Sequence, residues 1–159
     1  MQKITPFLWF NNNAEEAMNF YISLFDNSGV KNIMRNGPGG PGPEGSVLTA
    51  SFTLHGQEFV VLNGGPQPFS FNESVSFVIN CDSQEEVDKY WSALTADGGQ
   101  ESMCGWLKDK YGLSWQVVPV GMFQLLQGSD PEKSKRAMGA MMQMRKLDLD
   151  VMQKAYDGA

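Results

Sequence analysis

The stretch CGWLKDKYGLSWQVVP, which runs from Cys104 to Pro119, predicts two strands joined by a tight turn. Asp109 can accept hydrogen bonds from backbone N–H groups at the turn, and Gly112 can adopt the positive φ that a short hairpin needs. The second arm alternates between two sets of side chains, which is the period of a strand. One face carries Leu113, Trp115 and Val117, and the other carries Ser114, Gln116 and Val118. The hairpin therefore predicts a sheet with one packed face and one face that can line a pocket, with Pro119 ending the ladder.

The composition disfavours several classes of protein. The 159 residues suit one domain with a sizeable core. A formal net charge of −6 disfavours nucleic acid as a partner, because phosphate binding needs a basic patch. The apolar runs, such as Phe59–Leu62, are too short to cross a bilayer, and Met1–Ile4 leads into a strand pattern without a signal peptide. We expect a cytoplasmic protein with no nucleic-acid and no membrane partner.

The order strand, helix and three strands is predicted twice. The first copy comprises a strand over Ile4–Phe10, a helix after Asn13 that stops near Gly29, and strands over Val30–Arg35, Ser46–Leu54 and Gln57–Asn63. The second comprises a strand over Val75–Cys81, a helix after Ser83 and the hairpin. Each helix opens with the spacing of a capping box, which pairs Asn13 with Glu16 and Ser83 with Glu86.

Two offsets relate the copies. An offset of 70 matches, among others, Phe7 with Phe77, Glu16 with Glu86, Tyr21 with Trp91 and Leu24 with Leu94. Beyond the Gly/Pro-rich stretch 36–45 the offset is 56, as in Gly56 with Gly112 and Phe59 with Trp115. The difference, 70 − 56 = 14, is interpreted as an insertion made mostly of that loop, which is either a solvated loop or a lid.

One copy has a single helix and a small sheet, so it cannot bury both faces of the sheet alone. We therefore predict an α+β fold in a single domain, residues 1–159, with module 1 at 1–66, module 2 at 73–121 and a helical tail at 122–159. In the tail, helices are predicted over Met122–Gln127, after Asp130–Pro131 and after Asp148, the last stopping near Gly158. The middle helix is rich in methionine, which suits packing on the sheet or a soft partner surface.

Two motifs carry a resemblance to a known family. The first helix contains Glu15-Glu16-Ala17 followed by Phe20-Tyr21, and the hairpin contains the motif quoted above. Together with the doubled βαβββ pattern, they make the chain similar to the vicinal oxygen chelate superfamily, which includes glyoxalase I, bleomycin-resistance proteins and extradiol dioxygenases. It most resembles the PhnB-like branch, often labelled 3-demethylubiquinone-9 3-methyltransferase. The resemblance covers nearly the whole chain, including the tail.

The resemblance implies two βαβββ modules whose curved mixed sheets enclose a cleft, and a homodimer. The modules pair either within one chain or between two chains. In metal-using relatives four ligands come from the first and last strands of the modules, and the corresponding places here are Pro6, Val60, Ser76 and Gln116. Only Gln116 offers a conventional donor, and one neutral amide does not hold a divalent ion. We expect no metal and no cofactor. The cleft residues implied are Leu8, Glu58, Val60, Ser76, Trp106 and Gln116.

Each candidate for chemistry has a structural alternative, and no catalytic residue is assigned. His55 is the single histidine and lies at a strand turn, without an evident partner for general-base work. Cys81 and Cys104 make no disulfide framework, and Cys104 lacks a basic neighbour that would activate a nucleophile. Glu58 either is a buried carboxylate with a raised pKa or points to solvent.

Gln116 either orients a polar ligand or satisfies a neighbouring backbone group. Trp106 either faces the ligand or packs in a core or interface, whereas Trp115 is expected to pack under a helix.

These observations favour a dimeric PhnB-like protein that binds an unknown small molecule without a metal. Two alternatives remain open. One is a metal-dependent lyase or dioxygenase, or a cofactor-free enzyme that uses Glu58 or His55. The other is an antibiotic-sequestering protein, since an acidic chain suits a cationic drug. The sequence does not support a methyltransferase, because its glycines do not lie between a strand and a helix of an alternating parallel sheet.

Overall fold

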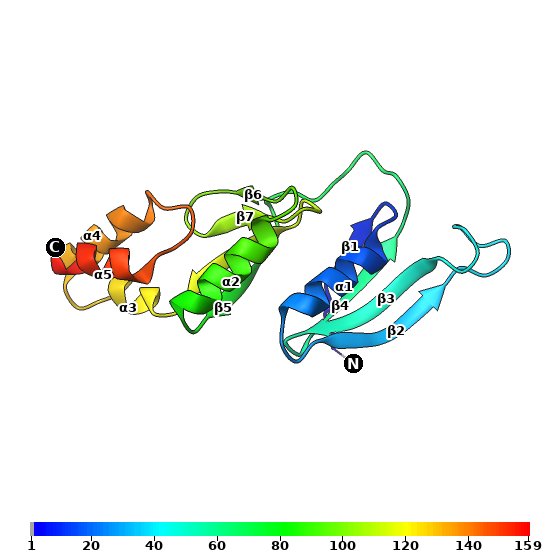
Figure 1. Cartoon of the computed structure of the whole chain (residues 1–159), viewed down its shortest axis with the longest axis horizontal. Helices are drawn as coiled ribbons and strands as arrows, with labels where there is room; N and C mark the ends of the chain where they lie inside the picture. Colours follow the sequence, from blue (N-terminus) through cyan, green and yellow to red (C-terminus); the bar gives the residue numbers. More distant parts are fainter. Residues whose placement is uncertain (1) are drawn as a thin grey trace. The chain divides into compact units, whose positions relative to one another are not determined.

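A computed structural model describes residues 2–159 of the chain. They form two compact units, of which one ends at Phe69 and the other begins at Ser70 (Figure 1). Each unit contains a four-stranded mixed sheet with a helix on it, so the α+β class is confirmed. No helix among residues 2–159 is long and apolar enough to cross a membrane.

The first unit has the order strand, helix and three strands. Its elements are β1 (Phe7–Phe10), α1 (Ala14–Leu24), β2 (Gly29–Arg35), β3 (Val47–Leu54) and β4 (Gln57–Asn63). The strand order is β1-β4-β3-β2, with β1 parallel to β4 and the other pairs antiparallel. The turn between β3 and β4 has only two residues, His55 and Gly56, both with positive φ, which suits the twist of a tight hairpin.

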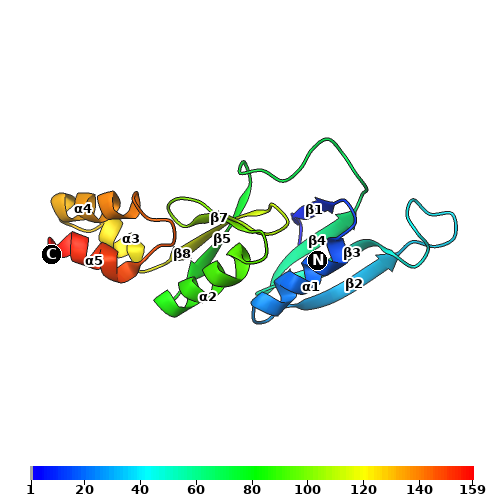
Figure 2. The same cartoon turned by 45° about the horizontal axis from the view of Figure 1, so that its top comes forward.

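The second unit repeats this topology. Its elements are β5 (Ser76–Cys81), α2 (Gln84–Thr95), β6 (Gln100–Glu101), β7 (Trp106–Lys108) and β8 (Ser114–Pro119). The order β5-β8-β7-β6 and the parallel pairing of β5 with β8 match the first unit, and Figure 2 shows the same helix-on-sheet arrangement in each. The doubled βαβββ pattern is therefore confirmed.

Each sheet has one face under its helix and one face without a helix, which we call the open face. In β1, Leu8 and Phe10 are buried on the helix side, whereas Phe7, which points to the other face of the sheet, is 58% exposed. In β5, Ile79 is buried on the helix side and Val78 is 49% exposed on the open face. The core of each unit thus lies between its sheet and its helix, which leaves the open face for other contacts.

Several predicted boundaries shift. The first strand begins at Phe7 rather than Ile4, and the Ile4 side chain is 87% exposed. Helix α1 ends at Leu24 because Phe25 is already extended, so Gly29 begins β2 instead of ending the helix.

The capping boxes differ between the helices. The Asn13 side chain makes no capping hydrogen bond, because Asn63 Oδ1 of β4 accepts from the Ala14 N–H at 2.9 Å. In α2, Ser83 Oγ accepts from the Glu86 N–H as predicted, but the Glu86 carboxylate accepts from the Asp82 N–H instead of the Ser83 N–H.

The register corrects the match between Phe7 and Phe77. Phe7 pairs with Val60, and Val78 pairs with Gln116. Val60 corresponds to Gln116 at the offset of 56, so their ladder partners, Phe7 and Val78, correspond as well. The first strands are therefore related by 71 residues, because 7 + 71 = 78, while the helices keep the offset of 70. The reason is that three residues, 11–13, separate β1 from α1, whereas two, 82–83, separate β5 from α2.

The loop at 36–45 is held by one buried side chain. Asn36 exchanges backbone hydrogen bonds with Ser46 and Gly45, and its Nδ2 donates to Ser46 Oγ at 2.9 Å. The loop therefore closes on itself at its base like an Ω-loop.

The tail forms α3 (Met122–Leu126), α4 (Pro131–Met141) and α5 (Leu149–Asp157), as predicted in kind. Asp130 and Asp148 cap α4 and α5, and Gly158 ends α5 with a φ of 83°. Its helices pack around their own small core together with β8. That core contains Val118, Met122, Leu125, Ala137, Leu147 and Met152.

The segment before α5 fastens the tail to the second unit. Gln84 of α2 donates to the Leu147 carbonyl at 2.9 Å and accepts from the Leu149 N–H at 3.0 Å. The Leu147 side chain is fully buried beside Gly105, where a Cβ would meet the Val117 carbonyl oxygen at 2.8 Å. Gly105 also has a φ of 83°, so a side chain there is excluded by both sterics and backbone.

Candidate ligand-binding site

The hairpin between β7 and β8 is organised by the buried carboxylate of Asp109. Its Oδ1 accepts from the N–H groups of Tyr111 and Leu113 at 2.8 and 3.1 Å, and its Oδ2 accepts from Trp115 Nε1 at 2.9 Å. Gly112 has a φ of 84° and donates its N–H to the Asp109 carbonyl. Asp109 therefore fixes both the turn and the indole of Trp115, as the sequence predicted for the turn, and Trp115 is buried as expected.

This hairpin aligns a row of polar residues across the open face of the second sheet. Ser76 of β5 pairs with Ser114 of β8, Ser114 pairs with Lys108 of β7, and Lys108 pairs with Gln100 of β6. Residues that lie opposite one another in neighbouring strands share a face of the sheet. The row therefore places two hydroxyls, an ammonium and an amide side by side.

A second row lies next to the first. Val78 pairs with Gln116, and Gln116 pairs with Trp106. Gln116 Nε2 donates to Ser76 Oγ at 3.0 Å, which links the two rows. The Gln116 amide is therefore held in one orientation by the Ser76 side chain, and its role toward a polar ligand stays a prediction.

The Ser114 hydroxyl is buried and has no hydrogen-bond partner in the part of the chain described. Ser114 as a whole is only 1% exposed. A buried hydroxyl without a partner costs about 1–3 kcal/mol, so such groups call for an explanation.

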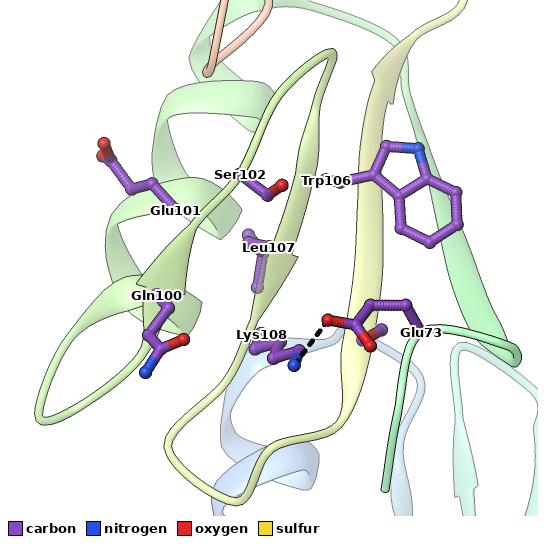
Figure 3. A pocket seen from close by; sticks show the side chains of 8 residues that line it. Glu73, Gln100, Glu101, Ser102, Trp106, Leu107 and Lys108 are labelled. Carbon is purple, nitrogen blue, oxygen red and sulfur yellow. Dashed lines mark ion pairs between the residues drawn. The ribbon is translucent and has the colours of Figure 1, made fainter.

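The hydroxyl borders a shallow pocket of about 140 Å³. The lining includes Glu73, Gln100, Ser102, Trp106, Lys108 and Ser114. Figure 3 shows the Lys108 and Glu73 side chains pointing toward one another, with the indole of Trp106 beside them. Glu73 lies before β5 in a turn that Asn72 stabilises by accepting from the Ser74 N–H at 2.9 Å.

The ion pair between Lys108 and Glu73 joins Nζ and Oε1 at 2.6 Å. The hydrogen bond from Lys108 lowers the pKa of Glu73 below its ordinary value. Glu73 therefore stays ionised at neutral pH, but its side chain is 62% exposed, so solvent screening keeps the pair weak.

The structure brings together three of the six residues expected in the cleft. Ser76, Trp106 and Gln116 lie on the open face of the second sheet. Glu58 and Val60 alternate on β4 with buried residues and lie on the open face of the first sheet. Leu8 is buried beside its partner Val61 on the helix side, so it does not share a face with Val60.

Glu58 does not have the raised pKa that one sequence alternative required. Lys31 of β2 makes an ion pair with its carboxylate, and the Gln2 N–H donates to Oε2 at 3.1 Å. These two interactions, with Lys31 the larger, lower the pKa of Glu58. A lowered pKa makes a carboxylate a weaker base, which disfavours Glu58 as a general base.

The other candidates have structural positions. His55 is exposed in the turn between β3 and β4. The Cys104 N–H donates to the Met144 carbonyl at 2.8 Å, so this residue helps to hold the tail. Burial raises the pKa of the Cys81 thiol to about 11, which leaves it protonated and unreactive at neutral pH.

The donor set does not suit a divalent metal. The places implied by metal-using relatives carry a proline, a valine, a serine and a glutamine, and the amide of Gln116 is bonded to Ser76. Among residues 2–159, no group of three or more His, Cys, Asp or Glu side chains converges. Divalent ions need several converging oxygen or nitrogen ligands, so these residues do not fit one.

Sequence reasoning missed Glu73, Lys108 and Ser114. Ser114 and Lys108 lie two residues from Gln116 and Trp106, so the strand period placed them on the same face. Glu73 lies in the connector, where no periodic pattern indicates a contact with a strand.

Comparison with known proteins identifies the chain's relatives. The model of the family 3-demethylubiquinone-9 3-methyltransferase matches residues 2–118. A PhnB protein from Bacillus cereus, described by the same enzyme name, is 43% identical, and the match covers 75% of this chain and 100% of that chain with a TM-score of 0.70. No match was found among curated proteins.

Two more distant structures share the fold. A protein from Pseudomonas aeruginosa is 22% identical, with 75% of this chain and 98% of that chain covered and a TM-score of 0.62. The fosfomycin resistance protein FosX from Listeria monocytogenes is 16% identical, with coverages of 74% and 90% and a TM-score of 0.50. The family match ends at residue 118, so the helical tail lies outside it, contrary to the expected extent of the resemblance.

Proposed function

Because this chain belongs to the PhnB-like family named 3-demethylubiquinone-9 3-methyltransferase, within the vicinal oxygen chelate superfamily, we propose that it binds a small organic molecule. The proposed site is the open face of the second sheet. The observation that carries the proposal is a pocket lined by Trp106 and the unpartnered Ser114 hydroxyl, next to Ser76 and Gln116 in the neighbouring ladder positions. Ligand sites combine apolar surface with a few placed polar groups, and this face offers both.

The proposed mode of binding uses no metal. At the ligand places of metal-using relatives only Gln116 offers a conventional donor, which disfavours lyase or dioxygenase chemistry of the metal-dependent kind. We do not propose the methyltransferase activity in the family name. Both sheets, β1-β4-β3-β2 and β5-β8-β7-β6, mix parallel with antiparallel pairs. Nucleotide-type cofactor sites use an alternating parallel sheet instead.

Two further features belong to the proposal. We propose a homodimer, because the open face of the first sheet exposes Phe7 and the second exposes Val78, which favours burial against another surface. We propose a cytoplasmic location, supported by two cysteines that are both free thiols.

The test is a screen of a chemically mixed fragment library against the full-length protein by protein-detected NMR. Gln116→Ala and Trp106→Ala should each abolish or weaken the binding of the same hits, whereas Val60→Ala on the first sheet should leave them unchanged. Melting curves check that each variant is folded. If Trp106→Ala does not fold, Gln116→Ala alone still tests the site. Hits that bind equally to all variants would contradict the proposed site.

A further inference from the structure

We propose that the pocket at Lys108 takes a small organic carboxylate that carries a flat apolar group, and that Glu73 is an internal stand-in for this ligand. The inference rests on the proposed function, because it names the class of ligand for the same site. In the structure, the carboxylate of Glu73 already makes the interaction with Lys108 that the ligand would make.

Glu73 leaves the hydroxyl of Ser114 without a hydrogen bond that a ligand could make. Ser114 lies opposite Lys108 in the ladder, and its hydroxyl can donate one hydrogen bond. Glu73 reaches the ammonium but not this hydroxyl. A ligand carboxylate has two oxygens, so it can accept from both groups and satisfy the buried hydroxyl.

The charges around the pocket favour an anion over a cation. Of its two carboxylates, Glu101 accepts from Trp91 Nε1 at 2.9 Å and faces Arg145 at 3.7 Å, and Glu73 is paired with Lys108. A cationic ligand that took Glu73 would leave the Lys108 ammonium, whose side chain is 32% exposed, beside a second positive charge. An anionic ligand that replaced Glu73 would release a side chain that is already mostly in water.

The size and lining of the pocket define the rest of the ligand. A cavity of about 150 Å³ holds one benzene ring, and this pocket measures about 140 Å³. The indole of Trp106 lines it and supplies a flat apolar surface on which a ring can stack (Figure 3). The pocket therefore suits about one ring, and the carboxylate of the ligand takes the place of the Glu73 carboxylate at Lys108.

The test compares three probes of nearly the same shape: benzoate, benzamide and benzamidine, which are anionic, neutral and cationic. Each is titrated into the full-length protein, and binding is followed by NMR on the indole N–H signal of Trp106, assigned with Trp106→Phe. We expect benzoate to bind most tightly and benzamidine least. Equal or tighter binding of benzamide or benzamidine at Trp106 would overturn the proposal.

Two charge variants locate the carboxylate. Lys108→Gln should weaken benzoate binding by about tenfold or more, since it removes a hydrogen bond to a charged group. Lys135→Gln, which removes the same charge from the exposed side of α4, should leave it unchanged. Equal effects of the two variants would mean long-range attraction only and would contradict the site.

Two further variants test the stand-in. Glu73→Gln should tighten benzoate binding by about two- to fivefold, because it removes a weakly paired competitor for Lys108. Glu85→Gln, at an exposed position of α2, removes the same charge as a control and should have no effect. Unchanged binding in Glu73→Gln would show that Glu73 does not compete.

The two proposals fail in different ways. Library hits that depend on Gln116 and Trp106 but are never carboxylates would overturn the ligand class and leave the proposed function standing. A library without any hit that depends on these two residues would overturn both.

Discussion

The open faces of the two sheets carry different side chains at equivalent positions of the same topology. Where the first sheet has Phe7 beside Val60, the second has Val78 beside Gln116. At the position where the first sheet has Glu58, which pairs with Lys31 of the same sheet, the second sheet has Ser114. The lysine next to Ser114, Lys108, pairs with Glu73 from the connector. The helix sides are alike, since both bury apolar residues. The fold is therefore set by the helix sides, whereas the open faces were free to diverge in chemistry.

The first unit also covers part of its own open face. Trp9 Nε1 donates to the Gly65 carbonyl at 3.1 Å, and its ring meets Phe69 edge-on at 5.3 Å between centroids. A Cβ on Gly64 would lie 2.2 Å from this indole, so only glycine fits there. The connector thus packs on an aromatic residue in the first unit, whereas before β5 it supplies a charge to the second.

The hairpin turns provide the largest expected difference between the units. Asp109→Ala removes an acceptor for three N–H donors, two of which are buried, so we expect a loss of about 3–6 kcal/mol in unfolding free energy. His55→Gly in the equivalent turn of the first unit should change it by less than about 1 kcal/mol, because that residue is exposed. Urea denaturation measures both, and similar losses would contradict the assigned role of Asp109.

The tail, which only the second unit carries, gives the next effect. Leu147→Ala should cost about 2–5 kcal/mol, since this fully buried side chain fills space beside Gly105. Val151→Ala on the exposed side of α5 should cost less than about 0.5 kcal/mol. Equal melting temperatures for Leu147→Ala and the parent protein would show that the tail is not coupled to the second unit.

Exchanging the central residues of the two open faces should have a smaller effect. Gln116→Val removes the hydrogen bond to Ser76 and should cost about 0.5–1.5 kcal/mol. Val60→Gln, at a half-buried position of the first sheet, should be tolerated within about 1 kcal/mol. Calorimetry on both variants checks this, and a greater loss from Val60→Gln would mean that the first open face is the more tightly packed.

The smallest expected effect concerns pH and the ion pair of the first sheet. Because Lys31 lowers the pKa of Glu58 below its ordinary value of 4.5, the pair's contribution is present above pH 4.5 and is lost as the pH falls through the lowered value. Glu58→Gln should therefore melt slightly below the parent protein at pH 7 and together with it once the pH is below the lowered pKa of Glu58. A difference that persists at low pH would assign it to packing instead.

Much of the fold could be predicted from the sequence, because short periodic segments report which side of an element is buried. The turn of Asp109 and the three tail helices follow from local signals of this kind. The cap of α1 could not be predicted, since its acceptor, Asn63, comes from a strand 49 residues away in the chain.

The candidate site was predicted less completely, and for a similar reason. Gln116, Trp106 and Ser76 followed from the resemblance, but their partners depend on the register between strands. Lys108 meets Glu73 only because the connector turns at Asn72, which no period in the sequence reports. Leu8 was placed beside Val60 although the register puts it beside the buried Val61.

The one additional residue between β1 and α1 has a practical consequence for protein engineering. To move side chains from one unit to the equivalent positions of the other, the residue number has to be shifted by 71 in the first strand and by 70 in the helix. An engineer who installs histidines to recreate a chelating pair would choose Phe7 with Val60, or Val78 with Gln116. Counting back 70 residues from Val78 would select Leu8 instead, whose side chain is buried on the helix side.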